Sequence, residues 1–196
     1  MKQISCSKTS QHTLFRKSKT LPQTYSIQHK EQIKEKLLSE LSGHSWKRSR
    51  EITLGIRISE QEESLESWIK QELIPALDGA GIRTFVIGEN TFKSKFKHIT
   101  FVPEERTKDV WTACDLFIWP KKSDLSEIMH HGTVCVTQDT SIENYDPQHE
   151  TGNGFVCPVK NAWSLFAEII RAQVNYSFPY DWKQISQSAM DWSYKN

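Results

Sequence analysis

Short apolar runs of strand length alternate along this chain with longer segments in which apolar residues recur every three or four positions. The short runs predict buried strands at 52–58, 84–87, 99–102, 116–119, 133–137 and 155–156. The helical spacing predicts helices at 28–41, 62–80, 105–114, 123–131 and 161–175. Strands and helices in alternation are typical of a parallel sheet with helices on both faces. We therefore expect an α/β fold, a single Rossmann-like domain with about six strands.

The first 27 residues lie outside this pattern. Residues 1–27 are rich in Ser, Thr, Gln and Lys and lack periodicity, which predicts a disordered basic arm before a domain at 28–196. Residues 1–50 carry a net charge of +8 and the remainder −7. Such an arm could bind nucleic acid or an anionic membrane, stay solvated, or fold back on the acidic domain. Because no aromatic interleaving or reading helix accompanies the charge, we do not expect a nucleic-acid partner.

The compartment is indicated by what the sequence lacks. No apolar run is long enough to span a membrane, and the first twenty residues hold no apolar signal-peptide core. The four cysteines show no C-x-x-C spacing, and three of them fall in or beside predicted strands as buried thiols. These features favour a reduced, cytoplasmic location, although delivery by a specialised secretion system stays open.

An ordered series of short motifs occupies most of the chain. It comprises HKEQIKEKLLSELSG, ITLGIRISEQE, RTFVIGEN, WTACDLFIW, Gly132 with Val134–Val136, TGNGFV, Arg171-Ala172, Trp182, Ala189-Met190 and Asp191-Trp192-Ser193. From about residue 29 onward this order resembles the C-terminal domain of the bacterial glycogen/starch synthase family. The resemblance implies half of a GT-B glycosyltransferase fold, the half that binds ADP-glucose or UDP-glucose. We expect no N-terminal acceptor domain, because residues 1–28 are too few to form one.

The donor-binding motifs of that family are altered in this chain. Arg57 matches the arginine of the family's R-L-x-x-Q-K motif, but Glu62 stands at the lysine position. A carboxylate beside a diphosphate repels it by about 1 kcal/mol or more. The segment after Pro120 is too short for the family's E-P-C-G-L loop. Asp124 or Glu127 could replace its glutamate, but we expect both at a helix start capped by Ser123.

The phosphate-binding turn after the next strand is altered as well. The family's T-G-G-L turn corresponds to Thr137-Gln138-Asp139-Thr140, which has no glycine to bring backbone amides around a phosphate. We therefore predict only a remnant donor site, formed by Arg57, Gln138 and Thr151, with no catalytic residue and no bound cofactor. A sugar nucleotide is not an expected ligand.

Other reactive residues lack the spacing that chemistry requires. His130 and His131 are adjacent and point to different sides of a helix, so we expect no metal site. Cys135 lies in the middle of a predicted strand with no base at identifiable spacing, and we expect no nucleophile there.

The C-terminal segment offers candidate interface residues. They are Tyr180, Trp182, Trp192 and Tyr194, which either pack on the chain's own sheet or meet another protomer or partner protein. We predict a non-catalytic glycosyltransferase-like domain that acts through protein contacts or weak carbohydrate or nucleotide binding. The alternative is a donor-binding subunit of a glucan synthase that another chain completes.

Overall fold

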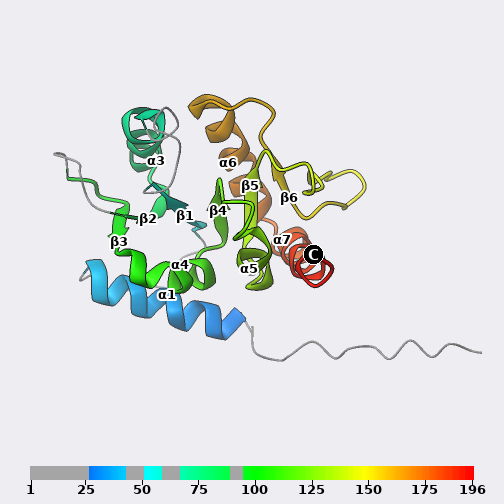
Figure 1. Ribbon diagram of the computed structural model, residues 1–196, viewed down its shortest axis with the longest axis horizontal. Helices are drawn as coiled ribbons and strands as arrows, with labels where there is room; N and C mark the ends of the chain where they lie inside the picture. The colour runs from blue at the N-terminus through cyan, green and yellow to red at the C-terminus, as the bar shows by residue number, and fades with distance from the viewer. Residues whose placement is uncertain (1–26, 43–50, 59–66, 89–94) are drawn as a thin grey trace, which may run out of the picture.

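The computed structural model describes residues 27–42, 51–58, 67–88 and 95–196. Six parallel strands form one sheet in the order β3-β2-β1-β4-β5-β6 (Figure 1). The strands are β1 (Thr53–Arg57), β2 (Arg83–Ile87), β3 (Ile99–Val102), β4 (Leu116–Ile118), β5 (Val134–Thr137) and β6 (Gly154–Val156). The expectation of an α/β Rossmann-like domain with about six parallel strands is confirmed.

Most of the helices follow predicted segments, but no predicted segment corresponds to the last helix, α7. They are α1 (Ile27–Ser42), η1 (Ile69–Leu73), α3 (Ile74–Gly79), η2 (Glu104–Arg106), α4 (Thr107–Ala113), α5 (Leu125–His130), α6 (Ala162–Tyr176) and α7 (Pro179–Ser193). Of the helix expected at 62–80, the structure describes the part from residue 67, and η1 is a π-helical turn. Pro75 lies just beyond it. Because proline offers no N–H to the preceding turn, a local change in hydrogen bonding at this point is expected.

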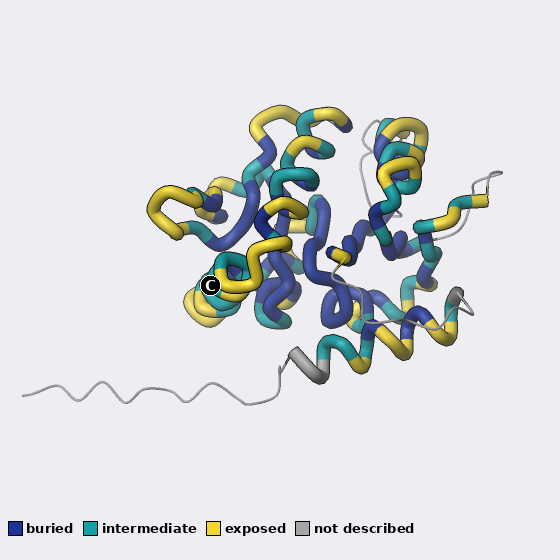
Figure 2. Tube along the Cα trace, turned by 180° about the vertical axis from the view of Figure 1, so that it is seen from behind, coloured by how far each residue is buried: buried dark blue, intermediate teal, exposed yellow. Residues whose placement is uncertain are grey.

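Two apolar clusters hold the helices against opposite faces of the sheet. One cluster joins η1, α3 and α6 to the sheet, through residues such as Leu73, Leu77 and Leu165. The other joins α1, α4 and α5, through residues such as Leu37 and Val110. In Figure 1, α3 and α6 lie above the strands, and α1, α4 and α5 lie below them. Figure 2 shows a mostly buried centre between these layers, and β3 at the edge of the sheet is only partly buried.

A buried polar network lies at the amino edge of the sheet, where β1 and β4 begin. Asp115 Oδ2 accepts hydrogen bonds from the Thr53 N–H at 2.9 Å, the Thr53 Oγ1 at 2.8 Å and the Lys34 Nζ at 2.9 Å. The side chains of Lys34 and Asp115 are only 1% and 7% exposed. Together with the Thr53 hydrogen bonds, this ion pair therefore fixes α1, which carries Lys34, to the starts of β1 and β4, and Asp115 is 81 positions from Lys34.

The electrostatics of this network favour its charged form. Burial alone would lower the pKa of Lys34, but Asp115 and Glu31 hold that pKa above its ordinary value. Burial alone would likewise raise the pKa of Asp115, but Lys34 and Lys30 hold it below its usual range. Asp115 belongs to the WTACDLFIW motif. Its contacts give that motif residue a structural role in docking α1.

Several local expectations are settled by the structure. Cys114, Cys135 and Cys157 are buried as expected, whereas Cys6 lies outside the described residues. The expected Ser123 cap is wrong by one residue: α5 begins at Leu125, so Asp124 occupies the N-cap position. The Ser123 hydroxyl instead donates to the Asp124 carboxylate at 2.8 Å, which turns it toward its neighbour. Within the described residues, no helix is both long and apolar enough to span a bilayer.

Candidate functional site at the carboxyl edge of the sheet

The strand order reverses direction between β1 and β4. The chain builds β1, β2 and β3 toward one edge, and then returns to add β4, β5 and β6 on the other side of β1. In open parallel sheets, ligands bind beyond the carboxyl ends of the strands at such a switch point. Arg57 is the last residue of β1, and Trp119 directly follows β4. These two residues therefore mark the position where a ligand of this fold would lie.

The side chain of Arg57 is already engaged by two carboxylates. Its Nε and Nη2 donate to Glu104 Oε2 at 3.0 and 2.8 Å, and its Nη1 lies 3.4 Å from Asp124 Oδ2. The Thr107 hydroxyl accepts from Nη2 at 3.3 Å. The Arg57 side chain is 18% exposed, and the Glu104 and Asp124 side chains are 39% and 22% exposed. The positive charge at the switch point is thus compensated within the domain.

The carboxylates of Glu104 and Asp124 lie on two different connections between strands. Glu104 opens η2 directly after β3, and the η2 turn brings it across β2 to the end of β1. Asp124 stands before α5, on the connection that leaves β4. Glu127, the other acidic residue of this helix start, instead pairs with Lys108 on the surface at 2.7 Å. Of the two acidic candidates, Asp124 belongs to the site and Glu127 does not.

One residue at the carboxyl edge of the sheet, Trp119, has a strained backbone conformation. Trp119 has a φ of 53°, in the left-handed region that bulky side chains rarely adopt. Its N–H donates to Val136 O on the neighbouring strand at 2.8 Å, and its side chain packs against the core on the α6 side of the sheet. Strained residues of this kind concentrate at functional sites of protein folds.

In the turn after β5, backbone N–H groups donate hydrogen bonds to side chains of the same turn. The Asp139 N–H donates to Thr137 Oγ1 at 3.1 Å, and the Ser141 N–H donates to Asp139 Oδ1 at 2.9 Å. The hydrogen bonds from Ser141, together with Lys122 at 3.6 Å, hold the pKa of Asp139 below its ordinary value. Gln138 lies within this turn and is half-buried. Two of the backbone N–H groups that could bind a phosphate, those of Asp139 and Ser141, are therefore occupied.

Thr151, the third predicted donor-site residue, lies farther out. It pairs with Asp146 through two backbone hydrogen bonds in the loop between β5 and β6, which projects from the sheet in Figure 1. Two strands, β4 and β5, separate β1 from β6. The structure thus places Arg57 and Gln138 at the carboxyl edge and Thr151 in a peripheral loop.

Arg171 fixes that loop to α6. Its Nη2 donates to Asn144 Oδ1 at 3.0 Å and to Tyr145 O at 2.6 Å, and its guanidinium lies 5.0 Å from the centre of the Phe155 ring. Gly152 permits the turn, because its φ is +110° and a Cβ there would lie 2.5 Å from Tyr145 Cα. The Arg171-Ala172 and TGNGFV motifs therefore have a structural explanation.

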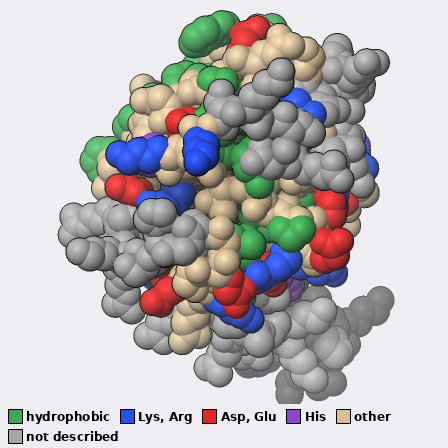
Figure 3. Space-filling model, turned by 90° about the vertical axis from the view of Figure 1, so that its left-hand side faces the viewer, with side chains coloured by type: hydrophobic (Ala, Val, Ile, Leu, Met, Phe, Trp, Pro, Cys, Tyr) green, Lys and Arg blue, Asp and Glu red, His purple; other side chains and the backbone are tan. Residues whose placement is uncertain are grey.

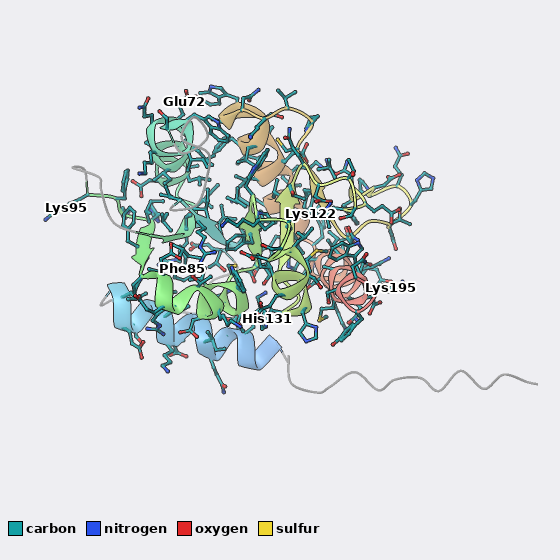
Figure 4. All side chains as sticks on the ribbon, in the orientation of Figure 1. Glu72, Phe85, Lys95, Lys122, His131 and Lys195 are labelled. Atoms are coloured by element: carbon teal, nitrogen blue, oxygen red, sulfur yellow. The ribbon has the colours of Figure 1, made fainter. Side chains whose placement is uncertain are left out.

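The histidine and cysteine candidates lie away from this edge. Burial, and then His130, lower the pKa of His131 to about 4, and Figure 4 shows His131 on the α1 and α5 side, apart from Lys122. Burial raises the pKa of Cys114 to about 12 and also raises that of Cys135. Among the described residues, no three His, Cys, Asp or Glu side chains lie together as a metal site would require.

The predicted interface residues divide into two pairs. Trp182 lies between Phe155 and Tyr176, with ring centres 6.5 and 5.1 Å away, and Trp192 Nε1 donates to Ser141 O at 3.0 Å. Both tryptophans therefore pack largely on their own domain. Tyr180 is 71% exposed, and Tyr194 is 47% exposed with its ring against His130.

Sequence reasoning did not find Glu104, the residue that engages Arg57 most closely. Forty-seven positions separate the two residues. In the sheet, β2 lies between β1, which ends at Arg57, and β3, which precedes Glu104. The acidic pair Glu104-Glu105 directly after a strand was the available signal. Figure 3, which faces the β3 side, shows acidic and basic side chains intermixed, without one large patch of either sign.

Comparison with known proteins gives a distant relationship. No protein-family model matches the chain. Glycogen synthase 1 of Synechocystis sp. is 26% identical over 94 residues, which cover 43% of this chain and 20% of that protein. Glycogen synthase of Bacillus subtilis is 25% identical over 128 residues, which cover 55% of this chain and 26% of that protein. The chain matches a fifth to a quarter of these relatives, and the similarity supports a glycosyltransferase-like relationship.

Proposed function

We propose that this chain is a glycosyltransferase-like domain that does not transfer sugar and acts through contacts with proteins. The observation that carries the proposal is the engagement of Arg57 by Glu104 and Asp124 at the switch point of the sheet. A diphosphate at this position would have to displace two carboxylates or lie beside them. Each close like-charge contact costs about 1 kcal/mol or more at a protein surface.

The turn after β5 supports the same proposal. Phosphate sites of this kind rely on backbone N–H groups that point at the ligand. The N–H groups of Asp139 and Ser141 are already bound to side chains of the turn itself, and Asp139 contributes a further carboxylate. Binding a phosphate would therefore require the turn to open.

One observation favours the alternative, a donor-binding subunit that another chain completes. The strand order and the place of Arg57 match the position at which open parallel sheets bind nucleotides. In that case a sugar nucleotide would replace Glu104 or Asp124 as the partner of Arg57. Weak binding of a nucleotide or carbohydrate without sugar transfer remains part of the first, non-catalytic proposal.

Thermal unfolding of the full chain with ADP-glucose or UDP-glucose separates the two functions. A ligand at about a hundred times its dissociation constant stabilises a protein by about 2.7 kcal/mol, which would raise Tm by roughly 5–10 °C for a domain of this size. We expect no such rise. A rise that Arg57→Ala abolishes would contradict the proposal and establish a working donor site.

A paired variant tests whether the carboxylates are the cause. In Glu104→Gln/Asp124→Asn the amides keep the shape of the site but remove both negative charges next to Arg57. We expect this variant to gain a measurable Tm shift with the sugar nucleotides. Glu127→Gln, which removes a carboxylate outside the site, is the matched control and should behave as the unmodified chain.

A further inference from the structure

Helix α1 makes polar contacts near both of its ends, at opposite edges of the sheet. Near its start, the Lys30 Nζ donates to the hydroxyl of Thr133, just before β5, at 3.0 Å. Near its end, Glu40 accepts a hydrogen bond from the Nη1 of Arg106, which follows β3. In Figure 1, α1 runs along the lower side of the molecule past α4 and toward β3. About 15 Å of helix between Lys30 and Glu40 therefore joins the amino edge to the carboxyl edge.

The first part of α1 is the firmly anchored part. Lys34 is buried in its ion pair with Asp115, and Leu37 is 0% exposed in the apolar cluster on this face of the sheet. Glu40 and Arg106 are more accessible, with side chains 44% and 23% exposed. The buried contacts fix the position of the helix, because breaking them would leave a charge unpaired in the interior. Glu40 therefore reaches η2 from a fixed support.

Arg106, the last residue of η2, is held by two carboxylates from two different helices. Its Nη1 donates to Glu40 of α1, and its Nε donates to Asp109 of α4 at 2.8 Å. A guanidinium is planar, and its N–H groups point in fixed directions, so two such bonds restrict its orientation. The three-residue turn η2 is thereby tied to both helices.

The residues on either side of Arg106 are the ones that engage Arg57. Glu104, two positions earlier, accepts from the Arg57 Nε and Nη2, and Thr107, the next residue, accepts from Nη2 at 3.3 Å. The Thr107 hydroxyl also donates to Glu104 O at 2.7 Å, which fixes the two residues relative to each other. A shift of η2 would therefore move both partners of Arg57 together.

We propose that α1 regulates the site at the switch point by holding Arg106. While Arg106 is held, η2 keeps Glu104 and Thr107 against Arg57, so Arg106 is a positioning residue for this contact. The inference rests on the proposed function, since it names what keeps the site closed. A protein contact that moves the end of α1 would release Glu104 and leave Arg57 more accessible.

The remaining partner of Arg57 limits the size of this effect. Asp124 reaches the Arg57 Nη1 at 3.4 Å from the connection before α5, which is separate from η2. Its contact is longer than the two that Glu104 makes, at 3.0 and 2.8 Å. Release of η2 should therefore open the site in part, while Asp124 still lies beside the guanidinium.

The rate at which phenylglyoxal modifies Arg57 tests the inference. This reagent attacks accessible guanidinium groups, and peptide mass spectrometry of the full chain assigns the rate to Arg57. In Glu40→Gln/Asp109→Asn the amides keep the size of both carboxylates but remove the charges that hold Arg106. We expect Arg57 to be modified about threefold to tenfold faster, as loss of two partly exposed ion pairs allows.

Two further variants calibrate this rate. Glu104→Gln weakens the closest contact of Arg57 directly and should accelerate its modification at least as much. Glu35→Gln/Glu127→Gln is the matched control, because it removes one exposed carboxylate from α1 and one from α5, where Glu127 pairs with Lys108. This control should leave the rate at Arg57 unchanged.

Combining the substitutions separates positioning from a general loosening of the domain. In the Glu104→Gln background, Glu40→Gln/Asp109→Asn should accelerate modification by a smaller factor than in the unmodified chain. The reason is that part of its effect acts through Glu104, and residues that act through one another are not additive. An equal factor in both backgrounds would show that α1 does not position Glu104, and would overturn the proposal.

The remaining outcomes separate this inference from the proposed function. If Glu104→Gln accelerates modification and Glu40→Gln/Asp109→Asn does not, the regulation by α1 is overturned. The proposed function stands in that case, because the sugar-nucleotide titration decides it independently. If neither variant changes the rate, Glu104 does not shield Arg57, and the observation beneath both proposals fails.

Far-ultraviolet circular dichroism of each variant verifies that it is folded. Because Glu40 and Asp109 are each 44% exposed, neither substitution should unfold the domain.

Discussion

The two ends of the sheet each carry a cation bound to a carboxylate, in different surroundings. At the amino edge, Lys34 and Asp115 are 1% and 7% exposed, whereas at the carboxyl edge Arg57 and Glu104 are 18% and 39% exposed. A buried pair cannot lose one partner without leaving an unpaired charge in the interior. A half-exposed pair can exchange its partner for water or for a ligand. The amino edge is therefore structural, and only the carboxyl edge could exchange partners.

The largest expected effect comes from Asp115→Asn. The amide keeps the shape of the carboxyl group but leaves the buried Lys34 ammonium with only the longer contact to Glu31, at 3.5 Å, as a counter-charge. We expect the free energy of unfolding to fall by about 3–5 kcal/mol, measured by urea denaturation. Asp109→Asn on the same segment of chain removes a carboxylate that is 44% exposed beside Arg106, and should cost about 1 kcal/mol or less.

A second substitution sharpens this prediction. Lys34→Met in the Asp115→Asn background removes the buried ammonium that has lost its close carboxylate, and should recover part of the lost stability. If Asp115→Asn cost no more than Asp109→Asn, the amino-edge pair would not have the structural role that its burial implies.

Protonation of His131 at low pH is expected to reduce the free energy of unfolding by an intermediate amount. Because burial lowers the pKa of His131 to about 4, against about 6.5 in an unfolded chain, the fold favours the neutral imidazole. The contribution is complete above pH 6.5 and is lost as the pH falls toward 4. For a partly exposed ring we expect about 1–2 kcal/mol, after allowing for solvent screening.

Urea denaturation at several pH values measures this contribution. In His131→Gln the loss of stability between pH 6.5 and pH 4 should be smaller than in the unmodified chain. An equal pH dependence in both proteins would show that other groups are responsible. The Thr112 hydroxyl, 3.4 Å from His131 Nδ1, can bond to glutamine in its place.

The smallest effect is expected at the carboxyl edge. Arg57→Ala leaves two carboxylates that reach water, so we expect a cost of about 1 kcal/mol or less. High salt should reduce this cost further, whereas the cost of Asp115→Asn should hardly change, because a buried pair is little screened. Denaturation of both variants with and without about 1 M NaCl makes the comparison. Equal salt dependence would remove the distinction between the two edges.

The order of strands and helices could be predicted because it depends on local periodicity. The runs at β1 and β5 lack the alternation of apolar and polar residues that a half-exposed strand has, and nearly all of their residues are buried, as in a strand covered on both faces. The absence of glycine from the turn after β5 was equally visible, because glycine is identified by residue type alone. The single-residue error at Ser123 could not be avoided from residue type, because serine and aspartate are equally favoured at the N-cap, and here the Asp124 side chain makes no capping hydrogen bond.

The sequence by itself determined which elements form and which residue types the carboxyl edge could offer. Only the tertiary structure decided which charges meet. Lys34 and Asp115 are 81 positions apart, and Arg57 and Glu104 are 47 apart. It also decided which side of α6 faces outward, because both sides have helical apolar spacing. Periodicity acts within one element, whereas partners and exposure depend on how distant elements pack.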